Sequence, residues 1–209
     1  MTRGVYIDEA SEKLSEVRSL IKRDIHREPA IRRSLLPVEP DAWMSAPVRK
    51  MARASVAAQV GPMAAVAGAV AEAVGMHLTR YSQEVVVENG GDIFIKSPYE
   101  KTVAVFAGMS PLSMKIGIKL LAPRGTGVCT SSGTVGHSIS GGRADAAVCV
   151  ADSAALADAA ATAAANGVRN ADEINGVLEE TLKIKGVKGC LIIIGETLGA
   201  AGGVELKEL

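Results

Sequence analysis

Two alanine-rich segments, residues 63–74 and 154–166, constrain the fold of this chain more than any other feature. Nearly all their side chains are small, so each segment favours a helix that can lie close to its neighbours. Aromatic residues make up only 3% of the chain, and there are 22 glycines. The core must therefore consist of small aliphatic side chains and close backbone approach, which suits helices packed tightly on a sheet.

The rest of the chain shows helical periodicity at first and a strand pattern later. Further helices are expected at 8–26, near 48–60 and at 172–183. Strands are expected at 85–87, 92–95, 102–106, 114–121, 146–150 and 190–194, with a last short one at 204–206. Because the strands come in runs, without regular β–α–β alternation, the pattern predicts an α+β fold with helices on one face of a largely antiparallel sheet.

Length allows one domain with a sizeable core, and we expect residues 1–209 to form a single domain. The two alanine-rich segments are alike in composition, so an alternative is an internal duplication of residues 48–122 and 123–209. A core with so few aromatic side chains often gains from a second subunit. A homodimer is therefore expected.

Charge and hydropathy argue against two classes of partner. The 23 acidic and 23 basic side chains cancel, so the overall basic field typical of nucleic-acid-binding proteins is absent. The most apolar run, residues 61–71, is far shorter than a membrane span, and residues 1–22 lack an apolar signal region. We expect a cytoplasmic protein with three reduced cysteines, no nucleic-acid partner and no membrane association.

Residues 127–138 concentrate reactive and polar side chains between glycines. Such a run is typical of a loop whose backbone N–H groups turn toward an anion such as phosphate. The candidates for ligand binding in this stretch are Thr130, Ser131, Ser132, Gly133 and Thr134.

Cys129 and His137 are the candidate catalytic residues of the same stretch. Packing does not require an imidazole among glycines and serines, so His137 is a candidate general acid–base. Cys129, Ser131 or Ser132 is a candidate nucleophile. The alternative for Cys129 is a small buried hydrophobic side chain, which is the commoner role of a free cysteine.

Asp158 and Thr162 lie four residues apart in the second alanine-rich segment, and therefore on one face of the predicted helix. Their oxygens are the hard ligands that Mg²⁺ prefers, with water and phosphate completing its coordination. A carboxylate among methyl groups is costly to bury unless it is paired. The alternative is a solvated aspartate on an ordinary amphipathic helix.

The motif Asn89-Gly90-Gly91-Asp92 separates two predicted strands. Turn chemistry explains it as a hairpin. The alternative is that the two glycines let a flat or anionic ligand reach the backbone.

These motifs occur in the same order as in ApbE, the FAD:protein FMN transferase, and the chain resembles that family. The closer resemblance is to a small uncharacterised family related to ApbE, through residues 60–68, 87–93 and 127–138. The resemblance implies a T-fold-like architecture with a nucleotide site between sheet and helices. It also implies that the bound flavin is FAD or FMN. In the case of FAD, Asp158 and Thr162 would hold Mg²⁺ beside its pyrophosphate. The flavin pocket would then be lined by Asn89, Gly90, Gly91, Asp92, Thr130, Ser131, Ser132 and Gly133.

The chain departs from ApbE in lacking its lipoprotein signal and the His-x-x-Asp-Pro segment that carries the catalytic histidine. Three functions follow. The first is a Mg²⁺-dependent flavin- or nucleotide-binding protein, with a transferase activity in which His137 replaces that histidine. The second is an accessory protein of sulfur assimilation, in homocysteine or thiol metabolism of anaerobes, using Cys129 with a lowered pKa. The third is a non-catalytic relic. The expected substrate is a small-molecule nucleotide or thiol.

Overall fold

The computed structural model describes residues 6–133 and 142–209. Residues 6–78 are mainly helical. They form α1 (Ile7–Arg27), α2 (Ala30–Arg33), α3 (Ala46–Ala58) and α4 (Val66–Leu78), with a 3₁₀ turn at Pro62–Ala65 just before α4. Two further helices, α5 (Ala154–Gly167) and α6 (Ile174–Leu182), lie between strands of the second half, with a 3₁₀ turn at Ala171–Glu173.

The strands described form one sheet in which every pair is antiparallel. The strands are β1 (Val85–Asn89), β2 (Asp92–Ala104), β3 (Ile116–Ser131), β4 (Ala146–Ala151), β5 (Val187–Ile194), β6 (Thr197–Gly202) and β7 (Glu205–Glu208). Their order in the sheet is β1-β2-β3-β4-β5-β6, and β7 pairs with the first part of β3.

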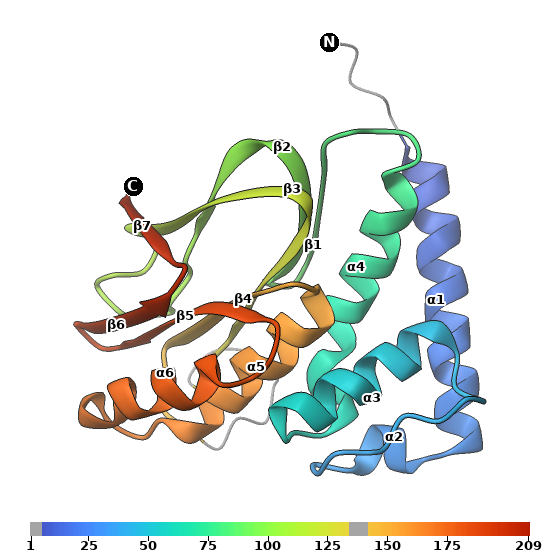
Figure 1. Cartoon of the computed structure of the whole chain (residues 1–209), viewed down its shortest axis with the longest axis horizontal. Coiled ribbons are helices and arrows are strands. Elements are labelled where there is room, and N and C mark those ends of the chain that lie inside the picture. Colours follow the sequence, from blue (N-terminus) through green and yellow to red (C-terminus); the bar gives the residue numbers. More distant parts are fainter. Residues whose placement is uncertain (1–5, 134–141) are drawn as a thin grey trace.

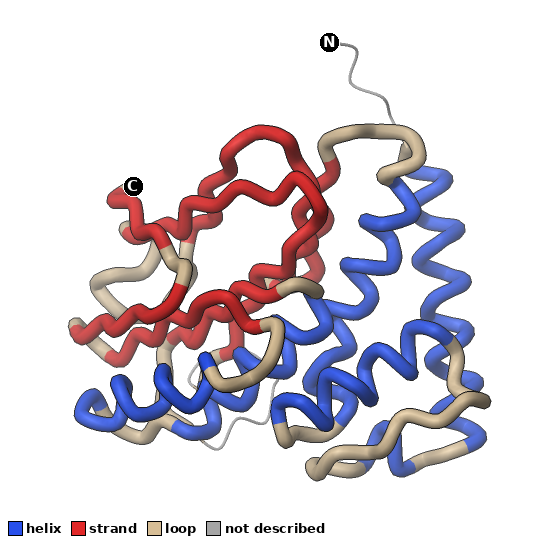
Figure 2. The backbone as a smooth tube through the Cα atoms, in the orientation of Figure 1, coloured by secondary structure: helices blue, strands red, loops and turns tan. Residues whose placement is uncertain are grey.

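The helices gather along one side of the curved sheet, as predicted (Figure 1). Helix α4 packs on β1 and β2, α5 packs on β3 and β4, and α6 packs on β5 and β6. Figure 2 shows the helical and strand regions as two adjoining layers. The α+β prediction with an antiparallel sheet is therefore confirmed.

The opposite face of the sheet carries a core of its own. Buried residues from the two ends of the β2–β3 hairpin, such as Ile95 and Ile118, join Val148 of β4 and Leu191 of β5 in one cluster. Because residues so far apart along β2 and β3 meet, the sheet must curve around them. Both faces of the central strands are thus buried, which explains why all six residues of β4 are buried.

The predicted strand boundaries need correction in the long hairpin. Residues 102–104 continue β2 after two register shifts, near Ile95 and Ser97, and do not form a separate strand. Strand β3 runs on from 116 to 131, so residues 127–131 belong to the sheet and not to a loop. Strand β6, rich in glycine and alanine, was not predicted.

Close backbone approach, expected from the composition, occurs where three elements meet at Ala154. A Cβ atom at Gly68 of α4 would lie 2.2 Å from the carbonyl oxygen of Ala154. A Cβ atom at Gly127 of β3 would lie 2.3 Å from the Ala154 Cα. Both positions therefore require glycine for α4, α5 and β3 to pack at this distance.

No single helix in the described ranges has the length and apolar character of a membrane span. Residues of α3 and 62–78 pass such a test only as a pair, and their axes are bent by 107°. The possible internal duplication and the homodimer stay predictions.

Candidate functional site

A cavity of about 680 Å³ lies between the β1–β2 turn, the end of β3 and the middle of α5. It brings together residues from β1 to α5 that lie far apart in sequence. Eight of the predicted site residues line it: Gly90, Gly91, Asp92, Thr130, Ser131, Ser132, Asp158 and Thr162.

The turn that forms one edge of this cavity is a two-residue hairpin between Asn89 and Asp92, which pair across the ladder. Gly90 has φ +68° and Gly91 has φ +104°, so both need glycine for conformation and not for space. The Asn89 side-chain Nδ2 donates to the Ala67 carbonyl oxygen over 3.1 Å. Asn89 therefore anchors the turn to the start of α4 and does not itself line the cavity.

The hydroxyl-rich stretch contributes side chains to the cavity, but its backbone is engaged elsewhere. Asp92 pairs with Cys129 across the β2–β3 ladder, and Ser131 pairs with Ala147 across β3–β4. The predicted loop with free N–H groups is therefore wrong for residues 127–131, because this segment is a strand that pairs with β4 along its whole length and also with β2 at residues 127–129. Beyond the strand, the Gly133 N–H donates to the Ala144 carbonyl over 2.9 Å.

Asp158 is buried, with 9% of its surface exposed, so it is not the solvated aspartate of the alternative interpretation. Its Oδ2 accepts a hydrogen bond from the Gly68 N–H over 2.9 Å, near the start of α4. Burial raises the pKa of Asp158, and the neighbouring Asp92 charge raises it further, while backbone N–H groups of Ala67 and Gly68 oppose the shift.

Asp92 is the second buried carboxylate of the cavity, with 8% of its surface exposed. Burial raises its pKa to about 6, although the neighbouring Cys129 thiol and a hydrogen bond from the Thr130 N–H act in the other direction. Its Oδ1 is fully buried and has no hydrogen-bond partner among the described residues. A carboxylate oxygen in that position is stabilised by a proton or by a cation.

The oxygen atoms in the cavity fit a Mg²⁺ ion that takes only some of its ligands from the protein. Asp92, Asp158 and the half-buried Thr162 offer hard oxygens to one cavity. Among the described residues, no three His, Cys, Asp or Glu side chains are grouped as a metal site. An ion held here would therefore need water or ligand phosphate for its remaining positions, as Mg²⁺ commonly does.

Cys129 is not among the residues that line the cavity. Its surface is fully buried, and its Sγ donates to the Ala154 carbonyl oxygen over 3.3 Å. Burial raises the pKa of the thiol, and the charges of Asp92 and Asp158 raise it further. This is opposite to the lowered pKa that the thiol-based hypothesis requires, and it agrees with the alternative of a small buried side chain.

The cavity also has an apolar wall, which was not predicted. Phe106 and Met114 line it, with 56% and 55% of their surfaces exposed. They follow β2 and precede β3, where no periodicity marks a binding site. Met114 has φ +60°, a left-handed conformation that few residues with side chains adopt.

The remaining predicted residues, Thr134 and His137, lie outside the residues that the structure describes.

Comparison with known proteins identifies close relatives of the whole chain. The model of a family described as AbpE bacteria matches residues 3–186. A UPF0280 protein of Methanococcus aeolicus is 40% identical over 205 residues, covering 95% of this chain and 83% of that protein. Another UPF0280 protein, of Methanocaldococcus jannaschii, is 38% identical over 205 residues, again covering 95% of this chain and 83% of that protein.

Solved structures with a similar fold are more distant in sequence. The flavinyl transferase ApbE of Pseudomonas stutzeri superposes with a TM-score of 0.58 at 11% identity, covering 97% of this chain and 88% of that one. An ApbE protein of Thermotoga maritima gives 0.52 at 17% identity, covering 68% and 51%. At these identities the likeness shows the fold alone.

Proposed function

This chain belongs to the AbpE bacteria family, and from that premise we propose that it binds a flavin nucleotide, FAD or FMN, with Mg²⁺ in the cavity lined by Asp92 and Asp158. The structures that share its fold include a flavinyl transferase, which supports a flavin as the first ligand to test.

The observation that carries the proposal is the unpartnered Oδ1 of Asp92 beside a second buried carboxylate. Two carboxylates removed from water repel each other, and both are costly to ionise without a compensating charge. A divalent cation removes this cost. Thr162, one turn after Asp158, adds a hydroxyl oxygen on the same face of α5.

The other residues of the cavity suit the remaining parts of such a ligand. The hydroxyls of Thr130 and Ser131 are hydrogen-bond donors for phosphate oxygens, whereas the Ser132 hydroxyl donates to the Ala144 carbonyl oxygen over 3.3 Å. Phe106 and Met114 offer an apolar wall against which a flat aromatic ring can pack. When bound, Mg²⁺ would neutralise charge on the phosphates.

Transfer of the flavin nucleotide to an acceptor is a further part of the proposal and would need an acid–base group. His137 is the residue we assign to it, from the sequence alone. Binding and transfer are therefore to be tested separately. The thiol-based alternative loses support because the Cys129 thiol is buried and its pKa is raised.

The experiment is a thermal-shift measurement on protein freed of metal with EDTA, then mixed with FAD, FMN or ADP, each with and without Mg²⁺. A ligand that binds only the folded state stabilises it, by about 2.7 kcal/mol at a hundredfold excess over Kd. We expect Tm to rise with FAD or FMN, and to rise further when Mg²⁺ is added.

Asp92→Asn is the informative variant, because it removes a buried charge and so should fold stably while losing the Mg²⁺-dependent part of the shift. Asp172→Asn, at an exposed position, is the matched control. Absence of a shift with every nucleotide, or a full Mg²⁺-dependent shift in Asp92→Asn, would contradict the proposal.

A further inference from the structure

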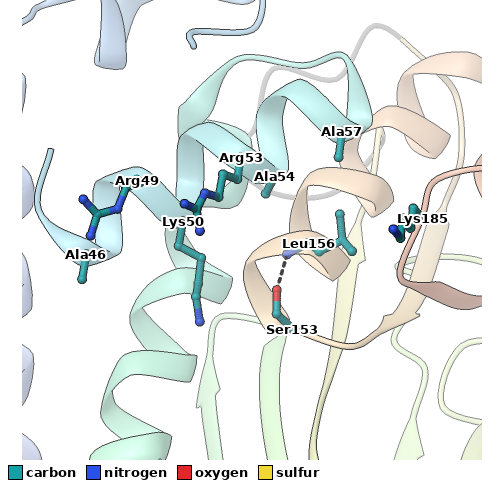
Figure 3. Close-up of a pocket in the computed structure, with 9 residues that line it drawn as sticks. All are labelled: Ala46, Arg49, Lys50, Arg53, Ala54, Ala57, Ser153, Leu156 and Lys185. Atoms are coloured by element: carbon teal, nitrogen blue, oxygen red, sulfur yellow. Dashed lines mark hydrogen bonds between the residues drawn. The ribbon is translucent and has the colours of Figure 1, made fainter. Parts of the chain in front are cut away.

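A second cavity, of about 450 Å³, lies on another part of the molecule, between α3 and the start of α5. Figure 3 shows Arg49, Lys50 and Arg53 along α3, with Ser153, the residue before α5, and Leu156 of α5 also lining the cavity. Lys185, in the turn before β5, closes the far side. None of the residues that line this cavity lines the first one.

The charges around this second cavity are segregated within a chain whose net charge is zero. Helix α3 carries three cations, Arg49, Lys50 and Arg53, and no acidic residue. Arg49 and Arg53 stand four residues apart, a spacing at which like charges destabilise a helix by about 0.2–0.5 kcal/mol. Such a cost is offset when an anion binds between the two side chains.

Among the residues that the structure describes, one of the four cations pairs with an acidic side chain. Lys50 forms an ion pair with the buried Glu72, with 2.6 Å between Nζ and Oε1. In the ranges the structure describes, Arg49, Arg53 and Lys185 have no ion pair, and Arg49 makes one long hydrogen bond to a carbonyl oxygen. The nearby Asp152 is paired with Lys188. A positive charge of about three thus remains uncompensated around the cavity.

Small side chains of α3 also line the cavity. Ala46 lies before the three cations in sequence, Ala54 and Ala57 lie after them, and Leu156 of α5 completes the apolar part of the lining. The start of α5 adds no free donor, because Glu72 accepts the N–H groups of Ala154 and Ala155, and Ser153 accepts that of Leu156. Binding would therefore depend on the cationic side chains.

We propose that this second cavity binds a compact polyanion, a small molecule carrying two or more phosphate groups. The guanidinium groups of Arg49 and Arg53 offer forked pairs of donors that match phosphate oxygens, and Lys185 adds a point charge across the cavity. This proposal does not rest on the proposed flavin function, because the two cavities share no residue.

The test is isothermal titration calorimetry with pyrophosphate and tripolyphosphate, in EDTA and at an ionic strength of about 0.15 M, where weak surface attraction is screened. Inorganic phosphate and citrate are comparison ligands. We expect tripolyphosphate to bind most tightly and phosphate most weakly. Arg53→Gln combined with Lys185→Gln should weaken tripolyphosphate binding by about tenfold or more, because charge-assisted contacts are lost.

The matched control is Lys22→Gln combined with Lys207→Gln, which removes the same charge from exposed positions elsewhere. It should bind tripolyphosphate within about twofold of the parent protein. Asp92→Asn should also leave this binding unchanged, which separates the second cavity from the first. Equal weakening in both double variants, or no binding of any phosphate compound, would overturn the proposal. Binding of a hexaglutamate peptide without binding of pyrophosphate would overturn it in favour of an acidic protein partner.

Discussion

The carboxylate of Glu72 in α4 accepts a hydrogen bond from the backbone N–H of Ala154, the first residue of α5, over 3.0 Å. The reverse contact joins the same helices, because Asp158 of α5 accepts the Gly68 N–H of α4. Each helix thus satisfies a donor at the start of the other, where the helix dipole also favours a carboxylate. An internal duplication would produce such reciprocity, and the duplication stays a prediction.

Glu72→Ala should lower the free energy of unfolding by about 2–3 kcal/mol, because Lys50 loses its partner and two buried N–H groups lose their acceptor. Urea titration measures this difference. Glu205→Ala, which removes an exposed ion pair with Lys119, is the control and should cost less than about 1 kcal/mol. Equal losses in the two variants would show that the Glu72 contact between α4 and α5 stabilises the protein no more than a surface ion pair does.

Gly68→Ala should destabilise the protein by about 1–3 kcal/mol or more, because a methyl group there would overlap the Ala154 carbonyl and force α4 and α5 apart. Gly176→Ala in α6 is the opposite case, since nothing lies within 4 Å of the added carbon. That substitution should stabilise by about 0.5–1 kcal/mol through helix propensity. Thermal unfolding of both variants measures the two changes in Tm. A change of the same sign in both variants would contradict the prediction.

Local signals were sufficient for the predictions that succeeded. Two glycines between paired strands specify the turn from Asn89 to Asp92, and the alanine-rich run predicts the helix that the structure has at Ala154–Gly167. The helix face that carries Asp158 and Thr162 follows from the helical repeat alone. These features depend on neighbours in sequence, so a single chain reveals them.

Features that depend on distant neighbours were not predictable. Residues 127–131 have the composition of a loop, but β4 pairs with all five of them and β2 pairs with residues 127–129. Gly127 is small because the start of α5 touches it, not because the backbone turns. The approach of Asp92 to Asp158 and the apolar wall at Phe106 likewise depend on how the sheet curves.

The pH dependence of stability should include a contribution from Asp24, a buried residue of α1 whose Oδ2 accepts the Ser45 N–H at the start of α3 over 2.7 Å. Burial acts to raise its pKa, but hydrogen bonds from Ser45 and Arg23 outweigh burial, so the pKa lies below its usual value. The folded state therefore binds the proton less tightly than the unfolded state. The stabilisation is present above the unfolded pKa and is lost as pH falls through the folded one.

Asp24→Asn should therefore cost about 1.5–3 kcal/mol near neutral pH, where the charged hydrogen bonds are intact. The difference from the parent protein should shrink as pH is lowered toward about 3. Urea titrations at several pH values measure it, with Asp8→Asn at an exposed site as control. A difference that grows in acid would contradict the assigned direction of the pKa.

All three thiols should be unreactive in the folded protein, because Cys129, Cys149 and Cys190 are buried. The Sγ atoms of Cys149 and Cys190 lie 3.6 Å apart across β4 and β5, also away from solvent. Titration with a chromogenic disulfide should detect almost no thiol before denaturation and all three afterwards. A Ser11→Cys variant, at an exposed site of α1, should react at once and provides the control. Rapid labelling of Cys129 in the folded protein would contradict this prediction and support the thiol-based function.

Phe106 should contribute to nucleotide affinity without contributing much to stability. It is more than half exposed and lines the first cavity, so its ring is available to a planar ligand. Loss of an aromatic contact is worth about 0.5–1.5 kcal/mol beyond buried area, so Phe106→Ala should weaken FAD or FMN binding by about threefold to tenfold or more. Quenching of flavin fluorescence measures the affinity.

Tyr99→Ala is the matched control for Phe106→Ala, because Tyr99 is equally exposed on β2 but does not line the cavity. It should leave the affinity unchanged, and both variants should unfold close to the parent protein. An ADP titration distinguishes the part of the ligand involved: if Phe106 packs against the flavin ring, the affinity for ADP should be the same in Phe106→Ala and the parent protein. Equal weakening for ADP and FAD would place the ring of Phe106 against the adenosine or phosphate part of the ligand, and the flavin would then need another wall.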